Sequence, residues 1–184
     1  MNYFFTADTH FFHKNVIDYC SRPFDDMYEM NSVMVKNWNS VVGKNDVVYH
    51  LGDFAITGSN RRLLEDVILS LNGNIHLVIG SHEKCALKFK HRFASVKDTM
   101  QITIEKQMLF GFHYCCKTWP RSHYGSWHIH GHSHGGLNDY AAGEGKIYDV
   151  GVDINNFTPI SYDQIVEIMK TRPLNFNDLK RRKH

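Results

Sequence analysis

The chain has 184 residues, of which 42% are hydrophobic and 22% are charged, and its formal net charge at pH 7 is +2. Length and composition predict one globular domain over residues 1–184. No extended basic surface is evident, so we do not expect long nucleic acid as a partner. No apolar run approaches a membrane span and residues 1–12 do not resemble a signal peptide, so we expect a cytoplasmic protein with no membrane partner.

The first half of the chain alternates apolar strands, polar clusters and helices. Apolar and aromatic runs without a helical period predict three strands, at residues 2–6, 47–51 and 75–79. Apolar residues at helical spacing predict three helices, at residues 16–19, 27–42 and, capped by Asn60, 61–71. This repeated order predicts a mainly parallel sheet with functional residues after the carboxyl ends of its strands.

The second half has shorter predicted strands and looks more antiparallel. The strands are expected at residues 102–104, 108–112, 127–130 and 146–153, with a tight turn at 106–107. In one of them, Trp127 and Ile129 lie on one face and His128 and His130 on the other. A Gly-rich loop precedes the last strand. An amphipathic helix over residues 162–171 follows, and we interpret the basic tail at 180–183 as a solvated end.

Cysteine and tryptophan are interpreted as structural residues. The four cysteines form no C-x-x-C pair, so they predict no structural zinc site; they are Cys20, Cys85, Cys115 and Cys116. In a cytoplasmic protein we expect them to be reduced thiols, buried or half-buried. The three tryptophans are expected to pack in the core, with stacking on a base as the alternative.

Side chains that can bind metals recur at the ends of the predicted strands. They are Asp8, His10, Asp53, His82, His113, His132 and His134. Taken alone, the stretch 131–134 fits two metal ligands or two solvated loop histidines equally well. Seven such positions at matching strand ends indicate one shared site. Carboxylates mixed with imidazoles suit transition metals better than Mg²⁺ or Ca²⁺, and so many ligands predict two ions, bridged by a carboxylate and about 3.5–4 Å apart.

Five ordered motifs resemble the calcineurin-like metallophosphoesterase superfamily over about residues 1–160. They are Asp8-x-His10, Gly52-Asp53, Gly80-x-His82-Glu83, Gly111-x-His113 and Gly131-His132-x-His134. The surrounding sequence is similar to small single-domain members found in bacteria and their phages. The resemblance implies an α/β fold, a four-layer α/β/β/α sandwich of two mixed sheets flanked by helices. It also implies a hydrolase with two divalent transition-metal ions, manganese first, with iron, zinc, nickel or cobalt as alternatives.

The resemblance also implies roles for individual residues. The first metal would be held by Asp8, His10, Asp53 and His134. The second would be held by Asp53, Ser81, His113 and His132. Asp53 would therefore bridge the two ions. The catalytic residues would be Asp53, His82 and Glu83, with His82 acting at the leaving-group oxygen as general acid or transition-state stabiliser and Glu83 orienting His82.

The third motif departs from the family pattern. The family's Gly-Asn-His reads Gly80-Ser81-His82 in this chain. The asparagine would give an amide oxygen to the second metal and a contact to phosphate, and a serine hydroxyl is shorter and a weaker metal ligand. We therefore expect weaker binding of the second metal and slower turnover. Ser81 is either natural drift or an engineered replacement that slows turnover so that a ligand can be trapped.

Two classes of function remain open from the sequence. The first is a dinuclear phosphodiesterase that uses a dimetal-activated water on a nucleotide-type phosphodiester, a cyclic nucleotide or a short oligonucleotide, with a phosphomonoesterase as its neighbour. The second is a metal- or ligand-binding protein whose turnover Ser81 impairs. The candidate substrate contacts are Ser81, His13, Arg22 and Arg121. An arginine can hold phosphate through two parallel hydrogen bonds, and a surface role is the alternative for both arginines. No sequence feature indicates an oligomeric state.

Overall fold

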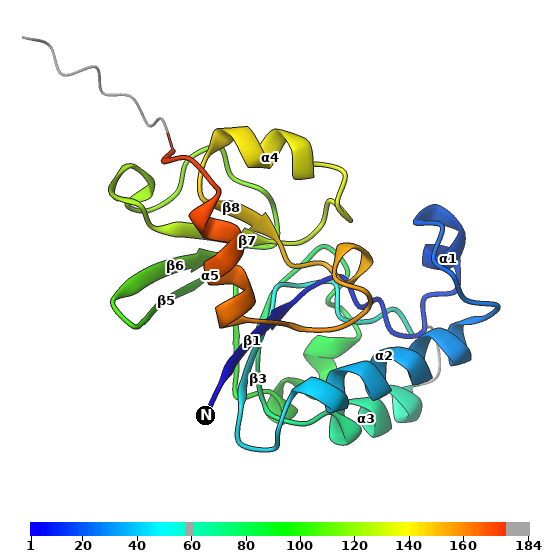
Figure 1. Ribbon diagram of the computed structural model, residues 1–184. Helices are drawn as coiled ribbons and strands as arrows, with labels where there is room; N and C mark the ends of the chain where they lie inside the picture. Colours follow the sequence, from blue (N-terminus) through cyan, green and yellow to red (C-terminus); the bar gives the residue numbers. More distant parts are fainter. Residues whose placement is uncertain (58–60, 176–184) are drawn as a thin grey trace, which may run out of the picture.

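The computed structural model describes residues 1–57 and 61–175. The predicted cap at Asn60 and the basic tail at residues 180–183 lie outside the described residues. In the described part, two sheets face each other with helices on their outer sides (Figure 1). This arrangement confirms the expected α/β fold of two mixed sheets flanked by helices.

The first sheet has the strand order β4-β3-β2-β1-β9. Its strands are β1 (Tyr3–Thr6), β2 (Val47–His50), β3 (Asn74–Val78), β4 (Ser95–Lys97) and β9 (Ile160–Ser161). The first four are parallel, and β9 runs antiparallel to β1. The parallel sheet predicted for the first half is therefore confirmed, with an edge strand, β9, that the sequence did not predict.

The second sheet has the order β5-β6-β7-β8. Its strands are β5 (Met100–Ile104), β6 (Gln107–Gly111), β7 (Trp127–His130) and β8 (Ile147–Asp149). Only β5 and β6 form an antiparallel hairpin, whereas β6, β7 and β8 are parallel. The antiparallel expectation is therefore wrong for most of this sheet. The connections, residues 112–126 and 131–146, are long crossovers of the kind that parallel neighbours require.

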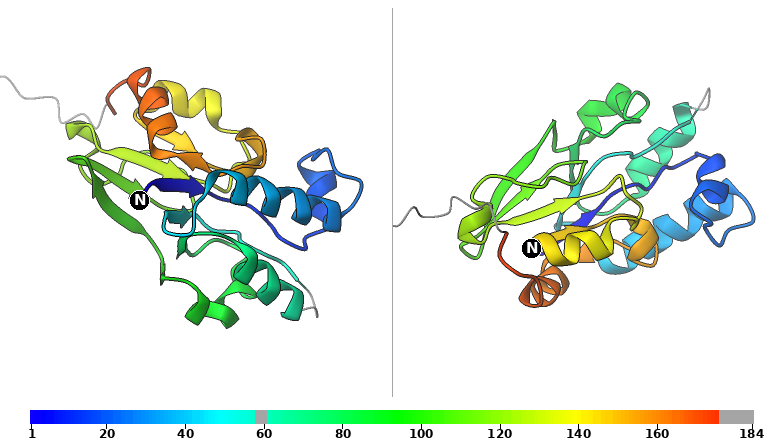
Figure 2. Two further views of the ribbon diagram at one scale, coloured as in Figure 1. Left: turned by 60° about the horizontal axis from the view of Figure 1, so that its bottom comes forward. Right: turned by 90° about the horizontal axis from the view of Figure 1, so that it is seen from above.

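Helices cover the outer faces of both sheets (Figure 2). The α-helices are α1 (Asn15–Tyr19), α2 (Met27–Val41), α3 (Arg61–Ser70), α4 (Asn138–Glu144) and α5 (Tyr162–Lys170). The described residues also form short 3₁₀ helices, η1 (Ala86–Arg92), η2 (Ser122–Tyr124) and η3 (Val152–Ile154). Helices α2 and α3 pack on the first sheet, and α4 packs on β8. Helix α4 lies where the sequence predicted a Gly-rich loop.

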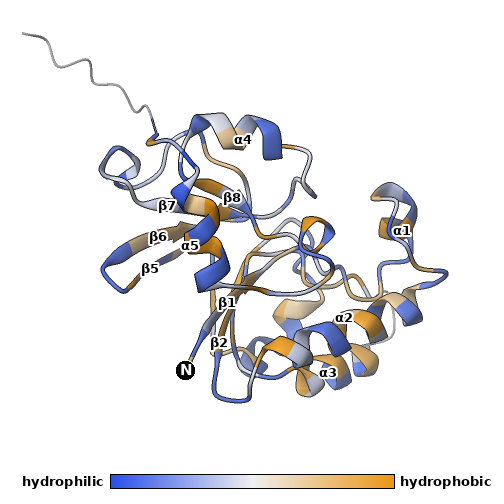
Figure 3. Ribbon diagram, in the orientation of Figure 1, coloured by the Kyte–Doolittle hydropathy of each residue, from blue (hydrophilic) through white to orange (hydrophobic). Residues whose placement is uncertain are grey.

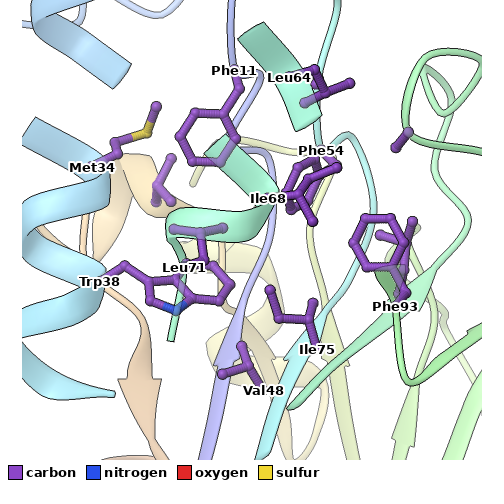
Figure 4. Close-up of a cluster of buried hydrophobic side chains, with 14 of the residues drawn as sticks. Phe11, Met34, Trp38, Val48, Phe54, Leu64, Ile68, Leu71, Ile75 and Phe93 are labelled. Atoms are coloured by element: carbon purple, nitrogen blue, oxygen red, sulfur yellow. The ribbon is translucent and has the colours of Figure 1, made fainter. Parts of the chain in front are cut away.

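Two apolar layers hold the sandwich together, and neighbouring residues of β1 contribute to different ones. Phe4 packs between the first sheet and the helices, in a cluster with Trp38 and Leu71 (Figure 4). Phe5 points the other way and packs between the sheets against Leu109 and Ile129. Successive side chains of a strand point to opposite faces, so a strand buried on both faces is apolar throughout.

All three tryptophans are buried, which confirms their expected place in the core. The helices are amphipathic, with hydrophilic and hydrophobic residues on different sides (Figure 3). Helix α2 begins at Asp26, whose side chain accepts hydrogen bonds from the backbone N–H groups of Tyr28 and Glu29. Among the helices of the described residues, none has the length and apolar character needed to cross a membrane.

Candidate metal centre

The loops after β1, β2, β3, β6 and β7 carry every residue that the sequence assigned to metal binding. Backbone hydrogen bonds join these loops to one another. The His10 N–H donates to the Asp53 carbonyl at 3.0 Å, and the Gly131 N–H donates to the His113 carbonyl at 3.0 Å. Strands of both sheets therefore deliver polar side chains to one place.

Among the described residues, three groups of three side chains are close enough to hold a metal ion. One of them, Cys20, His134 and Asp153, contains the bonded pair His134–Asp153, and the other two contain the residues that the sequence assigned to metals. The first ligand group is Asp8, His10 and His134. The second ligand group is Asp53, His113 and His132. Within each group, one ligand atom from each residue lies within 4.8 Å of the other two. The structure thus brings together the residues that the sequence divided between a first and a second metal.

The carboxylate of Asp53, a member of the second ligand group, also faces the first group. Its Oδ2 is 3.6 Å from His10 Nε2 and 3.5 Å from His113 Nε2. Its Oδ1 accepts a hydrogen bond from the His82 backbone N–H at 2.7 Å. Burial opposes ionisation of Asp53, but the hydrogen bond and charge of His113, with the His82 N–H, outweigh it and lower the pKa of Asp53. One oxygen of an ionised carboxylate is therefore fixed where it faces both groups.

The ligands occupy an uncommon backbone conformation. The angle φ is positive at five of them, Asp8 (57°), His10 (47°), Asp53 (56°), His132 (67°) and His134 (46°). For residues other than glycine this left-handed conformation costs about 1–3 kcal/mol and persists where the surrounding structure enforces it. Strain of this kind collects at functional sites. Its concentration in these loops indicates that they are built to position side chains, beyond connecting strands.

Two motif glycines are required because another part of the chain passes very close to them. A Cβ atom on Gly80 would lie 2.4 Å from the backbone N of Asp53. A Cβ atom on Gly131 would lie 2.5 Å from Ala7 Cβ and 2.7 Å from Asp8 Oδ2. Any side chain at either glycine would therefore displace a ligand carboxylate.

Hydrogen bonds on the far side of two ligand rings set their orientation. His113 Nδ1 lies 2.8 Å from the Leu51 carbonyl oxygen, and His134 Nδ1 lies 2.6 Å from Asp153 Oδ2. Both partners are acceptors, so each Nδ1 donates its proton and each Nε2 is the nitrogen that faces a metal. Burial opposes charge on both rings, but Asp53 and Asp153 raise the pKa of His113 and His134, so a metal at Nε2 would displace a proton. Burial lowers the pKa of His10 to about 3, so this ring is neutral.

Asp8 is a buried acid whose ionised form is not fully compensated by the positive charges near it. Both of its oxygens accept the backbone N–H of His132, at 3.0 and 2.9 Å. Burial nevertheless raises the pKa of Asp8 to about 7. A cation next to a carboxyl group favours its ionised form, so the first ligand group is suited to receive one.

Arg22 supports the first ligand group from behind. Its side chain is buried, and Nε and Nη2 bind the carboxylate of Asp153 at 2.7 and 2.9 Å. The guanidinium also donates to the backbone carbonyls of Asp8 and Thr9, at 2.7 and 3.1 Å. Asp153 in turn holds His134. The surface interpretation of Arg22 is therefore wrong, and its interpretation as a phosphate contact stays a prediction.

Arg121 also lies away from the ligands. It lines a hollow with Gln107, where β6 begins, and Ser126, just before β7. Its guanidinium lies 5.7 Å from the ring centre of Tyr124. The ligand loops follow the opposite ends of β6 and β7. The structure therefore does not bring Arg121 together with the ligand groups, and its contact with substrate stays a prediction.

His82 and His13 lie beside the first ligand group. The ring centre of His10 is 5.8 Å from that of His82 and 5.2 Å from that of His13. The His82 side chain is exposed, and His13 is half-buried. Glu83 is buried, and its Oε1 accepts the Phe54 N–H at 2.9 Å. That bond supports the turn just after Asp53, whereas the resemblance implied that Glu83 would orient His82.

Ser81 lies on the open side of the second ligand group. Its Oγ is 3.4 Å from His113 Nε2 and 2.9 Å from Tyr114 Oη. The Tyr114 ring packs edge-on against the His132 ring, with centres 4.6 Å apart. Ser81 is therefore placed where a second metal would have its open face, and it has a phenol as its neighbour.

Sequence reasoning missed the acids that support the ligand loops. Asp149 is buried, and its Oδ2 accepts hydrogen bonds from Ser133 Oγ at 2.6 Å and from the Gly135 N–H at 3.0 Å. It thereby fixes the loop that carries two ligand histidines. Asp149 and Asp153 both lie on the predicted strand 146–153, so the strand-end signal that identified the ligand acids could have found them.

Known proteins resemble this chain in sequence and in structure, although no family model matches it. It is 34% identical over 171 residues to the uncharacterized protein MJ1445 of Methanocaldococcus jannaschii, which is 89% of each chain. Its structure is similar to that of AQ665, a protein of unknown function from Aquifex aeolicus, with a TM-score of 0.73 and 24% identity over 91% of this chain and 98% of that one. The structural similarity to YfcE, a phosphoesterase from E. coli, is weaker, with a TM-score of 0.46 and 19% identity over 82% of this chain and 78% of that one. A similarity this slight does not bear on function.

Proposed function

The chain belongs to the same protein family as MJ1445, and we propose that it is a metal-dependent phosphoesterase that hydrolyses nucleotide-type phosphodiesters. One observation carries the proposal. Two groups of side chains that could hold a metal meet at one ionised carboxylate, that of Asp53, whose Oδ2 is 3.6 Å from His10 Nε2 in the first group and 3.5 Å from His113 Nε2 in its own group. A pair of sites that share a carboxylate is the arrangement of two-metal hydrolases that act on phosphate esters.

The residues present fit the pair of ions that the family resemblance implies. Each ligand group offers one carboxylate and two imidazoles, a set that suits manganese and its transition-metal neighbours. Three of the imidazoles are held with a nitrogen available, two by their hydrogen bonds and His10 by its neutral, buried state. Bound there, divalent ions would polarise the phosphoryl oxygens and lower the pKa of a water molecule.

The chain's own residues position the metal ligands and supply a proton donor. Asp53 lies close to His10 of the first group and to His113 of the second, and so links the two groups. The Arg22–Asp153 pair holds His134 in place. The exposed imidazole of His82 lies at the edge of the site, where it can donate a proton to the departing oxygen. His13 lies next to it, which gives the leaving-group side of the site two imidazoles.

Two exposed tyrosines favour a diester with nucleotide character. Tyr19 is 75% exposed, and its ring centre is 6.3 Å from that of His13, beside the first ligand group. Tyr114 is 40% exposed beside the second ligand group. A diester has two substituents to place, and a base stacked on an aromatic ring gains about 1–3 kcal/mol. One ring on each side of the centre suits a cyclic nucleotide or a short oligonucleotide.

The test is hydrolysis of two nitrophenyl esters. Protein stripped of metal with a chelator and then given Mn²⁺ should release nitrophenol faster from bis-p-nitrophenyl phosphate than from p-nitrophenyl phosphate. A matched Asp53→Asn sample should release none above background. A faster monoester reaction would replace the diesterase proposal with a phosphomonoesterase. No product from either ester would indicate a metal-binding protein without turnover.

A product screen would then name the substrate. Cyclic nucleotides, dinucleotides and short oligonucleotides should be compared at equal phosphodiester concentration. The two tyrosines predict that nucleotides with purine bases, which stack better, are cleaved with a lower KM than diesters without a base. Equal KM values for alkyl and nucleoside diesters would contradict the nucleotide assignment and leave the phosphodiesterase assignment standing.

A further inference from the structure

Ser81 and Tyr114 form a pair of hydroxyl groups, here called the hydroxyl pair, on the open side of the second ligand group. Their oxygens are 2.9 Å apart. Both residues are exposed, although Ser81 Oγ is also 3.4 Å from His113 Nε2. The hydroxyl pair therefore faces solvent directly beside a ligand of the second metal.

The phenol of Tyr114 is held firmly. Its ring centre is 4.6 Å from that of His132, 4.9 Å from His113 and 5.4 Å from Phe112. The backbone beside it is fixed by His128, whose Nε2 accepts the Cys116 N–H at 2.9 Å. A ring packed on three sides and anchored through its backbone presents its hydroxyl in one direction, which is what a substrate contact needs.

Packing explains the ring of Tyr114 but not its hydroxyl. A phenylalanine would make the same ring contacts with His113, His132 and Phe112. A hydrogen bond between two exposed hydroxyls adds little to folding, because water competes for both groups. The hydroxyl is placed next to Ser81, at the position where the family resemblance implies an asparagine that contacts phosphate.

We propose that Tyr114 contacts the substrate, its hydroxyl donating a hydrogen bond to a non-bridging oxygen of the phosphoryl group. Ser81 donates its own proton to Tyr114 Oη, which leaves the phenolic O–H to point at the substrate. The hydroxyl pair thus supplies the phosphate contact that Ser81 alone is too short to make. This inference rests on the proposed phosphoesterase function, and no bond to Tyr114 forms or breaks.

The experiment compares Tyr114→Phe with wild type and with Tyr124→Phe as a matched control. Tyr124 is an exposed tyrosine beside Arg121, at the other end of the second sheet. With bis-p-nitrophenyl phosphate at saturating Mn²⁺, Tyr114→Phe should lower kcat about tenfold to a hundredfold, as expected for a lost hydrogen bond to a charged group. The Mn²⁺ concentration for half-maximal activity should stay unchanged, because Tyr114 is not a ligand. The control should keep the wild-type kcat.

A second pair of variants separates substrate contact from a structural effect. In a Ser81→Asn background the amide takes over the phosphate contact. Adding Tyr114→Phe to that background should therefore lower kcat by less than about threefold. The proposal is overturned if Tyr114→Phe leaves kcat unchanged. It is also overturned if the loss is as large in the Ser81→Asn background, or if a shift in Mn²⁺ dependence accounts for it.

A binding measurement keeps this inference distinguishable from the proposed function. Inorganic phosphate is titrated by calorimetry into Mn²⁺-loaded wild type, Tyr114→Phe and Tyr124→Phe. Only Tyr114→Phe should bind phosphate more weakly, by about tenfold. If wild type releases no nitrophenol, the phosphoesterase proposal fails, and this comparison still decides whether Tyr114 contacts phosphate. Equal affinities in all three proteins would overturn the inference.

Discussion

The two ligand groups share one carboxylate but differ in what supports them. Behind the first group lies a buried ion pair, in which Arg22 binds Asp153 at 2.7 Å and Asp153 holds His134 at 2.6 Å. Behind the second group lies a backbone carbonyl, that of Leu51, bound to His113. In the first group Asp8 and His10 are buried and His134 is half-buried, whereas in the second group His132 is exposed.

This difference in support and exposure predicts different roles for the two ligand groups. Supporting hydrogen bonds behind a ligand raise metal affinity, so the first group should bind its ion more tightly. An open group with weaker support leaves room for a phosphate ester to approach. We therefore assign tight metal binding to the first group and substrate contact to the second, with Asp53 joining the two.

The largest expected effect is that of Asp53→Asn, which removes what the two groups share. Loss of this negative charge between the groups should weaken both metal positions and lower hydrolysis of bis-p-nitrophenyl phosphate on the order of a thousandfold. Activity and Mn²⁺ content, measured on the same samples, check this. A variant that loses one position and keeps the other at full affinity would break the shared-carboxylate account.

Arg22→Gln tests the support of the first group. Removing one partner of a buried ion pair costs about 3–5 kcal/mol of stability, and losing support for a ligand costs about tenfold to a hundredfold in metal affinity. The tightly bound Mn²⁺ should be weakened and the free energy of unfolding lowered. Arg92→Gln is the matched control, because Arg92 pairs with Glu65 at 2.8 Å on the surface, and its loss should cost at most about 1 kcal/mol.

The Arg22 comparison has a clear contrary outcome. If Arg22→Gln destabilises the fold but binds the first Mn²⁺ as tightly as wild type, the ion pair serves folding alone. The difference in support between the two ligand groups would then have no consequence for metal binding.

Ser81→Asn should strengthen the second group and leave the first unchanged. An amide oxygen reaches further than a hydroxyl and is the better ligand, so turnover should rise by roughly tenfold and weaker-site Mn²⁺ affinity should rise with it. Ser81→Ala provides the opposite change and should lower turnover below wild type. Equal rates for wild type and Ser81→Asn at saturating metal would refute the role given to this position.

The smallest expected effect is the pH dependence of stability that comes from His128. Burial lowers the pKa of His128, which anchors the backbone beside Tyr114, from 6.5 to about 3. The unfolded chain therefore binds a proton first, so this contribution to stability is complete above pH 6.5 and is lost as pH falls towards 3. Between about pH 7.5 and 6 the loss should be about 1 kcal/mol.

Urea unfolding of wild type and His128→Gln at both pH values checks this, since glutamine keeps an acceptor but does not titrate. The variant should show a shallower fall in stability. Burial opposes ionisation of Asp153, but His134 and Arg22 lower its pKa, so the carboxylate of Asp153 stays ionised over this range. Identical pH dependence in the two proteins would contradict the neutral, buried state of His128.

Much of this centre could be predicted because it depends on local sequence. A polar residue after an apolar strand, as at Asp8 or Asp53, is visible in the chain, and parallel strands bring their ends to one edge. The motif glycines Gly80 and Gly131 are also visible in the sequence, and the fold supplies the reason for them, since a Cβ atom at either would meet a neighbouring loop.

The support of the centre could not be predicted in the same way. Arg22 looks like a surface residue until the fold shows Asp153, far along the chain, beside it. The parallel order of β6, β7 and β8 depends on long crossovers whose course no local pattern gives. Glu83 binds a backbone N–H, a partner that leaves no trace in the side-chain sequence.

The most direct test of the central claim is the amount of manganese held by the folded chain at equilibrium. Metal-free protein is dialysed against a series of Mn²⁺ concentrations, and bound metal is measured for wild type and Asp53→Asn. The account predicts two ions per wild-type chain, the first bound more tightly than the second, and weaker binding of both in the variant. A single ion per chain at saturation, or two ions that Asp53→Asn binds as tightly as wild type, would contradict it.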